Sequence, residues 1–213
     1  MEQPITITNH LFSNKRFFSR LEFLLAYYRE GHILHIGNVS GWSKEGKFSS
    51  IYLKFCERIA PSNQVYGFDI ESPNQKEPYL NQKEGDILEG LPYPDKFFDT
   101  IYMGEVLEHL KNPGVALSEI RRVLKDAGIF IVDVPNAYSL LRMSIYMLKR
   151  KESLGNPTHL IMYTPGSLNA ILIESGFSIE EMTTDKSKKL KWLPDILTKG
   201  IGHHLLVVAK KHP

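Results

Sequence analysis

The sequence has a single cysteine, Cys56, in 213 residues. One thiol can form no disulfide within the chain, which excludes a disulfide-stapled scaffold and suits a reducing compartment. No run of about 20 apolar residues occurs, so the sequence predicts no helix that crosses a membrane. The first ten residues also lack the basic start and apolar run of a secretion signal. We therefore expect a soluble, cytoplasmic protein.

The excess of positive over negative charge is also small: the sequence has 26 Lys and Arg and 24 Asp and Glu, which gives a net charge of +2. A nucleic-acid-binding surface usually shows a concentrated basic stripe, and only residues 149–151 and 186–191 come close to one. We interpret both runs as solvated faces and expect no nucleic-acid partner. Repeats and low-complexity tracts are absent as well, so residues 1–213 fit one domain.

Short apolar runs alternate with helical patterns along the chain. Apolar residues at helical spacing over 12–28 stop at Gly31 and predict a leading helix within residues 1–31. Turn residues bound five apolar runs that we predict to be strands, at 32–36, 64–68, 100–103, 128–134 and 204–209. Further helical patterns lie at 50–59, 113–124 and 165–175. This alternation predicts an α/β fold with a parallel, doubly wound sheet whose strands end at one rim.

Two segments interrupt the alternation, residues 137–159 and 183–200. The first joins an apolar stretch, 140–148, to the basic run at 149–151. Such an insertion after a central strand suits a cap over a substrate, an interface such as that of a homodimer, or a peripheral membrane contact. We favour a cap or an interface, because the apolar stretch is short and the net charge is low.

Three points that suit a ligand follow successive predicted strands. Gly37 and Gly41 follow the first, where a glycine turn lets backbone approach a ligand closely, although a plain strand-to-helix turn explains them equally well. Asp69 ends the second strand, where an acid accepts hydrogen bonds from ribose hydroxyls or caps a turn. Asp86 comes next, and its carboxylate is able to accept from the exocyclic amine of a purine.

The segment GEVLEHL adds an acid-rich junction between a strand and a helix. The helix dipole favours acids at a helix N-terminus, and we favour that role for Glu108. His109 in this segment and His159 in NPTHL are candidate proton acceptors, because histidine changes its charge near neutral pH. A single histidine more often holds a loop in place, so this second role stays open for both.

Taken in order, these motifs resemble those of class I S-adenosylmethionine-dependent methyltransferases, in the branch that acts on small molecules and glycans (type 11/23-like). The resemblance runs from about residue 33 to 209 and rests on LHIGNVSG, VYGFDI, GDILEGLPYPDKFFDTIY, GEVLEHL and NPTHLIMYTPGSLNAILIESGF. It implies a Rossmann-like sheet, mostly parallel with an antiparallel last strand, with helices on both faces and a cap insertion.

The resemblance also implies a site with S-adenosylmethionine as cofactor and no metal. The implied cofactor-binding residues are Gly37, Asn38, Val39 and Gly41 in the glycine loop, Asp69 and Ile70 at the ribose, Asp86 and Ile87 at the adenine, and Gly104 and Glu105 on the inner wall. The implied reaction moves a methyl group to an oxygen, less favourably a nitrogen, of a small metabolite or sugar. His159 and His109 are then the candidate bases, because such a reaction needs alignment and removal of a proton.

The glycine loop departs from the family pattern L-D-[IV]-G-x-G-x-G. His35 replaces the acid and Val39 replaces a glycine. A β-branched residue adopts positive φ only at a cost, so we expect the loop to open differently here. This departure keeps a second hypothesis open, a catalytically silent binding or scaffolding protein with the same fold. A nicotinamide dehydrogenase is disfavoured, since G-x-G-x-x-G is missing after the first strand.

Overall fold

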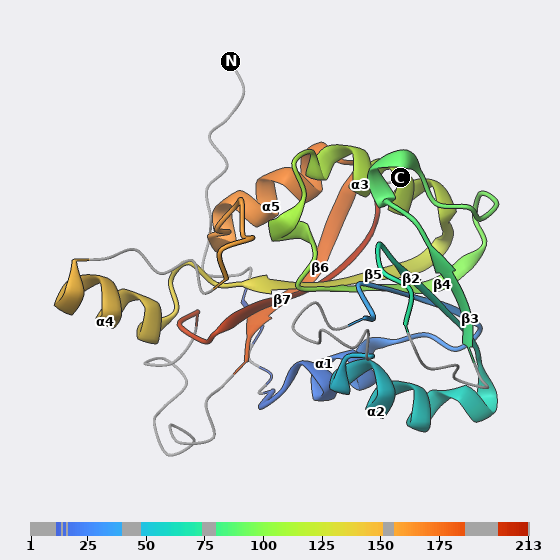
Figure 1. Ribbon diagram of the computed structural model, residues 1–213, viewed down its shortest axis with the longest axis horizontal. Helices are drawn as coiled ribbons and strands as arrows, with labels where there is room; N and C mark the ends of the chain where they lie inside the picture. Colours follow the sequence, from blue (N-terminus) through green and yellow to red (C-terminus); the bar gives the residue numbers. More distant parts are fainter. Residues whose placement is uncertain are drawn as a thin grey trace.

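A computed structural model gives the structure of residues 12–13, 15, 17–39, 48–73, 80–150, 156–185 and 200–212. Seven strands form one sheet in the order β3-β2-β1-β4-β5-β7-β6 (Figure 1). The strands are β1 (His32–Ile36), β2 (Gln64–Asp69), β3 (Leu80–Glu84), β4 (Phe98–Gly104), β5 (Leu124–Pro135), β6 (Phe177–Thr184) and β7 (His204–Lys211). The helices are α1 (Arg20–Tyr27), α2 (Ser50–Ile59), α3 (Pro113–Val123), α4 (Leu140–Lys149) and α5 (Pro165–Glu174), with short 3-10 turns η1 (Ala60–Ser62), η2 (Ile87–Glu89) and η3 (Leu107–His109).

The pairing of the strands confirms the predicted fold class. β3, β2, β1, β4 and β5 pair in parallel, whereas β7 runs antiparallel to both β5 and β6. The carboxyl ends of the five parallel neighbours therefore meet at one rim of the sheet, where open α/β sheets bind their ligands. The last strand is antiparallel, as the resemblance implied.

Helices cover both faces of the sheet (Figure 1). On β1, Ile33 packs into the cluster formed with α1 and α2, and Leu34 packs into the opposite cluster formed with α3 and α5. Successive residues of a strand point to opposite faces, and both faces of a doubly wound sheet are buried. Continuous apolar strands such as HILHI are therefore what this architecture requires.

The leading helix is shorter than predicted. It begins at Arg20 because the Ser19 side chain accepts a hydrogen bond from the backbone N–H of Glu22 and caps the helix. Phe12, expected inside the helix, forms an isolated bridge to Met182 beside the sheet edge instead. The apolar residues before Arg20 therefore have helical spacing in the sequence without forming part of α1.

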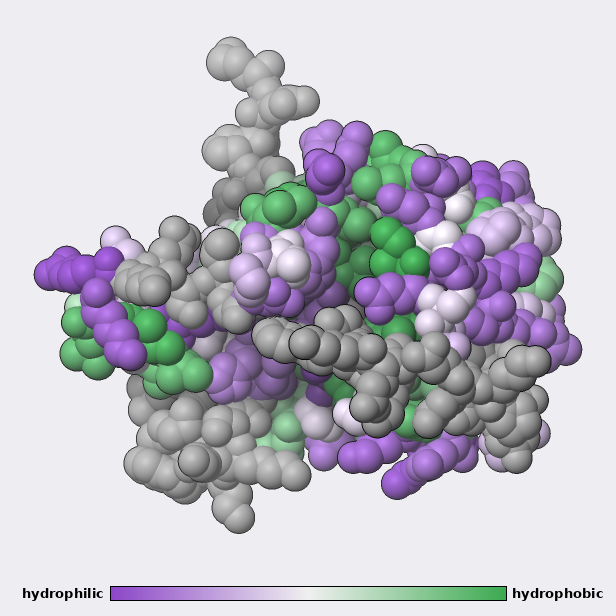
Figure 2. All heavy atoms as spheres, viewed as in Figure 1, coloured by the Kyte–Doolittle hydropathy of each residue, from purple (hydrophilic) through white to green (hydrophobic). Residues whose placement is uncertain are grey.

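The insertion at 137–159 contains α4, which extends away from the sheet (Figure 1). None of the α4 residues is buried, and the apolar side chains exposed on it give a patch of hydrophobic surface (Figure 2). Within the described parts of the chain, no helix combines the length and the apolar character needed to span a membrane. The sequence predicts a second insertion at 183–200. The structure corrects its first two positions, because Thr183 and Thr184 complete β6. Positions 186–199 lie outside the described residues.

The turn LPYPD at 91–95 is held from α3 by one arginine. Arg122 donates hydrogen bonds to the carbonyl oxygens of Leu91 (2.8 Å) and Tyr93 (2.9 Å), and to Asp95 Oδ1 (2.8 Å). Glu119 orients this guanidinium from one helical turn away and accepts from the Leu91 N–H. This part of the motif is therefore a latch between two segments of the fold.

We expect Arg122→Ala to lower the free energy of unfolding by about 2–3 kcal/mol, because a charged donor with several backbone partners is lost. Urea denaturation followed by circular dichroism measures the loss. Arg121→Ala is the matched control on the same helix, since Arg121 makes a single long bond (3.4 Å) to the Gly176 carbonyl. Equal losses in the two variants would contradict the latch.

Candidate functional site

The predicted ligand-binding positions gather along the carboxyl-end rim. Gly37 follows β1, Asp69 ends β2, Asp86 follows β3, and Gly104 ends β4. These strands are consecutive neighbours in the sheet, so residues spread over about 70 positions line one continuous edge. Gly41 lies outside the described residues.

Gly37 begins the loop after β1. It has φ of 77° and donates its N–H to the Phe68 carbonyl at 2.9 Å. A Cβ at this position would collide with the Val106 side chain, so this site demands glycine on both conformational and steric grounds.

Val39 adapts to the loop without the strained backbone that we expected. It is buried, forms an antiparallel bridge with Phe48, and is absent from the non-glycine residues with positive φ. Its N–H donates to Asp69 Oδ2 at 2.8 Å. The bridge to Phe48 accommodates a β-branched side chain at position 39, and residues 40–47 lie outside the described residues.

Asp69 joins this loop to the end of β2. Its carboxylate accepts from the backbone N–H groups of Val39 and Glu71. Burial raises the pKa of Asp69, and these backbone bonds partly offset the effect. A carboxylate has about four acceptor positions, so two contacts leave acceptor capacity that faces the rim.

Asn38 has a structural contact that the sequence did not indicate. Its side-chain amide is fully buried and exchanges hydrogen bonds with Gln82 of β3, at 2.7 and 3.3 Å. The pair passes over Gly67 of β2, where a Cβ would strike both amides. The Asn38 side chain therefore fastens the loop to the sheet.

The residues expected near the adenine differ in exposure. Asp86 caps η2 by accepting from the Leu88 N–H at 2.9 Å. Ile87 is 4% exposed and packs into the core, whereas Ile70 is 65% exposed beyond the end of β2. Ile70 thus offers free apolar surface at the rim, and Ile87 supports the turn from below.

An ionic network that sequence reasoning missed forms the inner wall. Arg20 of α1 contacts Asp133 of β5 (3.0 Å) and Glu105 (2.5 Å), and the Tyr102 hydroxyl donates to Asp133 at 2.5 Å. Burial raises the pKa of Asp133, with partial compensation from Arg20. The only sequence signal was an aspartate within the apolar run of β5.

His204, at the start of β7, completes the network. Its Nδ1 lies 2.9 Å from Asp185 Oδ2 and its Nε2 lies 3.2 Å from Glu105 Oε1. Burial lowers the pKa of His204, but the hydrogen bonds to the two carboxylates outweigh burial and raise it to about 9. For Glu105, burial is likewise outweighed by His204 and Arg20, and the pKa falls to about 2. The histidine is therefore a cation at neutral pH.

His35, which replaces the acid of the family pattern, faces the core. It is 2% exposed and makes edge contacts with the rings of Tyr52 and Tyr102. Burial, followed by the charge of Arg20, lowers its pKa to about 3. His35 is thus a neutral packing residue beneath the loop.

The structure brings the two candidate bases together. The His109 and His159 rings meet edge to face at 4.7 Å, and Glu108 lies beside them with Oε1 3.9 Å from His159 Nε2. The helix-end interpretation of Glu108 is wrong, because its side chain is fully buried in a three-residue 3-10 turn. Burial, and then the charges of Asp133 and Glu105, raise the Glu108 pKa to about 8.

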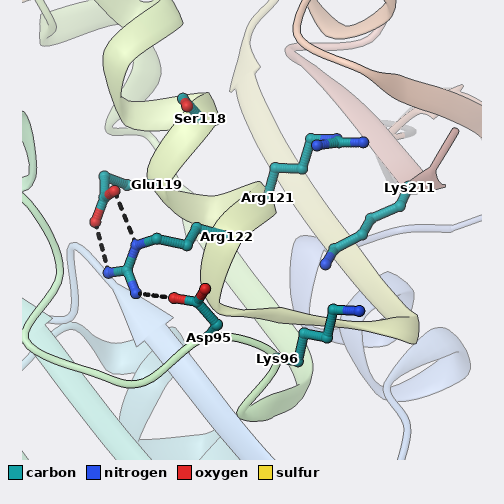
Figure 3. Close-up of a pocket in the computed structure, with 7 residues that line it drawn as sticks. All are labelled: Asp95, Lys96, Ser118, Glu119, Arg121, Arg122 and Lys211. Carbon is teal, nitrogen blue, oxygen red and sulfur yellow. Dashed lines mark hydrogen bonds and ion pairs between the residues drawn. The ribbon is translucent and has the colours of Figure 1, made fainter.

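A shallow pocket of about 380 Å³ lies at the opposite, amino-end rim (Figure 3). Most of its charged side chains form ion pairs: Arg122 pairs with Asp95 and Glu119 within the pocket, and Lys96 and Lys211 both pair with Asp126 outside it. These contacts match a surface that stabilises the fold, so the rim at the carboxyl ends remains the candidate site.

Known proteins share these features. The family described as "methyltransferase domain" matches residues 20–182. A probable methyltransferase of Aspergillus luteorubrus is 26% identical over 76% of this chain and 62% of its own length. A probable S-adenosylmethionine-dependent methyltransferase of Mycolicibacterium smegmatis is 30% identical over 56% of this chain and 46% of its own length. The chain thus spans less than two thirds of these relatives.

The fold has solved counterparts as well. A S-adenosylmethionine-dependent methyltransferase from Archaeoglobus fulgidus superposes with a TM-score of 0.67 over 90% of this chain and 91% of its own, at 21% identity. At this identity the likeness concerns the fold. It agrees with the strand order and with the single antiparallel strand among the described residues.

Proposed function

The chain belongs to the S-adenosylmethionine-dependent methyltransferases, and we propose that it transfers a methyl group from this cofactor to an oxygen, less favourably a nitrogen, of a small metabolite or sugar. The observation that carries the proposal is the row of Gly37, Asp69, Asp86 and Gly104 along adjacent strand ends. Ligands of open α/β sheets bind at such a rim.

The residues at the rim suit the proposed cofactor. The free acceptor positions of Asp69 match two ribose hydroxyls, and the exposed Ile70 offers an apolar contact for a purine ring. Asp86 supplies a carboxylate for an exocyclic amine, while Gly37 lets the backbone come close. We therefore retain these positions as cofactor-binding residues, with Val39 and Asn38 acting through the shape of the loop.

For methyl transfer, the protein has to align the methyl donor with the acceptor and to accept one proton. The bound cofactor supplies a methyl carbon on a sulfonium, open to in-line attack by the acceptor. Glu105 would form the wall beside this carbon. His109 follows Glu105 by four positions in the chain, and its ring lies 4.7 Å from that of His159. These two histidines are our candidates to take the proton from an acceptor hydroxyl.

The acceptor would enter beneath the insertion that contains α4. Arg142 of this helix is partly buried and its charge acts on both Glu105 and Glu108, so α4 reaches toward the rim. We propose residues 137–159 as the cap over the acceptor, with its exposed apolar surface as the part that meets an apolar acceptor or a second copy of the chain.

The test is calorimetric titration with S-adenosylmethionine. We expect Asp69→Ala to weaken binding by about a hundredfold, since two hydrogen bonds to a charged acceptor are lost. Glu71→Ala is the matched control, because it removes an exposed acid two positions away. A folded wild-type protein that shows no binding at millimolar cofactor would overturn the proposal.

A second candidate is a catalytically silent protein of the same fold. It is favoured by one observation, the bond between the Val39 N–H and the Asp69 carboxylate that ties the altered glycine loop to the ribose-binding acid. The same titration separates the two candidates, because a silent protein with a closed loop binds no cofactor.

A further inference from the structure

Glu108 is a buried acid without a hydrogen-bond partner for its carboxylate among the described residues. Both oxygens are enclosed and the side chain is 0% exposed. A carboxylate in such a place is costly unless a cation or donors satisfy it. Its position three residues after Glu105 of the proposed inner wall makes it a candidate ligand for a bound group.

Two imidazoles lie beside this carboxylate. Glu108, His109 and His159 each offer one ligand atom, and these atoms lie within 4.8 Å of one another. Ligand atoms about 2.1 Å from a tetrahedral ion lie roughly 3.4 Å apart, so binding requires atoms as far apart as 4.8 Å to approach by up to about 1.4 Å.

Neighbouring backbone groups orient the residues that carry the three ligand atoms. His109 Nδ1 lies 3.1 Å from both the carbonyl oxygen and the hydroxyl Oγ1 of Thr158. In the tautomer that donates from Nδ1 to the carbonyl, the Nε2 lone pair is open to a metal, as in metal-bound histidines with an outer-shell partner. The Glu108 carbonyl accepts from the N–H groups of both Leu160 and Ile161, at 2.9 and 3.1 Å. This clamp holds the loop that carries His159 against the turn that carries Glu108.

We propose that Glu108, His109 and His159 bind a divalent transition-metal ion beside the methyl-transfer site. Two imidazoles and one carboxylate suit zinc, manganese or cobalt better than magnesium or calcium, which prefer oxygen alone. Three protein ligands leave open positions on the ion, as in catalytic metal sites. The proposal departs from the expectation of no metal, because no sequence pattern places His159 beside Glu108 and His109.

The ion would activate the methyl acceptor, a role that rests on the proposed function. An acceptor hydroxyl bound at the open position loses its proton to water more readily. The oxygen then forms a bond to the methyl carbon while the carbon–sulfur bond breaks. His109 and His159 act as ligands in this scheme, and their role as bases would apply only without an ion.

Arg142 is the opposing charge near the cluster. Its guanidinium acts on Glu105 and Glu108 electrostatically, so it lowers the affinity for a cation while α4 stays in place. Glu105 and Asp133 add negative charge around Glu108, and His204 opposes them. A cation at the cluster would therefore be attracted by three carboxylates and repelled by Arg142 and His204.

Titration of chelator-treated full-length protein with zinc or cobalt chloride tests the proposal. We expect one ion per chain, and we expect Glu108→Gln and His159→Asn to weaken binding by more than the 10–100-fold typical of losing an outer-shell partner. Glu57→Gln and His212→Asn, outside the cluster, are matched controls that should bind like wild type. Cobalt absorption in the visible range reports nitrogen ligands directly.

Cofactor titration of the same samples separates this inference from the proposed function. Glu108→Gln keeps the shape of the side chain and resembles the neutral acid favoured by its raised pKa, so the variant should fold and still bind S-adenosylmethionine. Absence of zinc and cobalt binding by wild-type protein that binds cofactor would overturn the metal site alone. Equal metal binding by wild type and both cluster variants would overturn it as well.

Discussion

Replacing Arg20 with methionine is expected to lower the free energy of unfolding by about 3–5 kcal/mol, the usual cost of removing one partner of a buried ion pair. Asp133 is 1% exposed and its side chain contacts Arg20 at 3.0 Å. Methionine fills much of the same volume, so the loss comes from the carboxylate left without its cation. Urea denaturation monitored by circular dichroism gives the difference.

Two comparisons make this prediction specific. Arg58→Met removes an exposed arginine from α2 and should cost less than about 1 kcal/mol. The double variant Arg20→Met with Asp133→Asn should regain part of the loss, because asparagine is neutral and still accepts from the Tyr102 hydroxyl. A loss for Arg20→Met no larger than that of the control would show that the pair contributes nothing.

The same arginine holds an unusual backbone at the site. Glu105 has φ of 54°, a conformation that costs a non-glycine residue of order 1–3 kcal/mol and persists only where surrounding contacts enforce it. Its N–H donates to the Asp133 carbonyl, and its carboxylate meets Arg20 and His204. The network thus holds Glu105, which forms the inner wall, in a fixed conformation at the rim.

Local patterns in the sequence predicted the central strands and helices well. β1 and α2 have the predicted bounds, because their apolar runs are buried and their ends carry clear turn or cap residues. β3 was missed, since LNQKE lies at the sheet edge and is almost entirely polar. β6 was missed for a similar reason, as the other edge strand. Edge strands need little apolar character, so periodicity does not report them.

The contacts that build the site were beyond sequence reasoning. Arg20 and Asp133 are 113 positions apart, and no local pattern in the sequence pairs them. Glu108 was interpreted as a helix-end acid because only its neighbours in sequence were considered; its burial depends on the loop of His159, about 50 residues later. Pairings over such distances follow from the packing of whole elements.

Stability should fall by about 3.5 kcal/mol through His204 alone as the pH rises from below 6.5 to above 9, as about 2.5 pKa units at about 1.4 kcal/mol each imply. The folded pKa of about 9 lies above the ordinary 6.5. The folded state therefore binds the proton more tightly, and this contribution is complete below pH 6.5 and lost as the pH rises through 9. His35, with its lowered pKa, acts below pH 6.5 and leaves this range unaffected.

The difference between wild type and His204→Gln isolates the effect, because Glu108, whose raised pKa also lowers stability as the pH rises to about 8, is common to both proteins. Free energies of unfolding measured at half-unit steps should converge as the pH approaches 9. A constant difference across this range would mean that the imidazole is neutral throughout. In that case the neutral imidazole, which has a single N–H, would donate to only one of Asp185 and Glu105, and the inner wall would carry more negative charge toward the methyl donor.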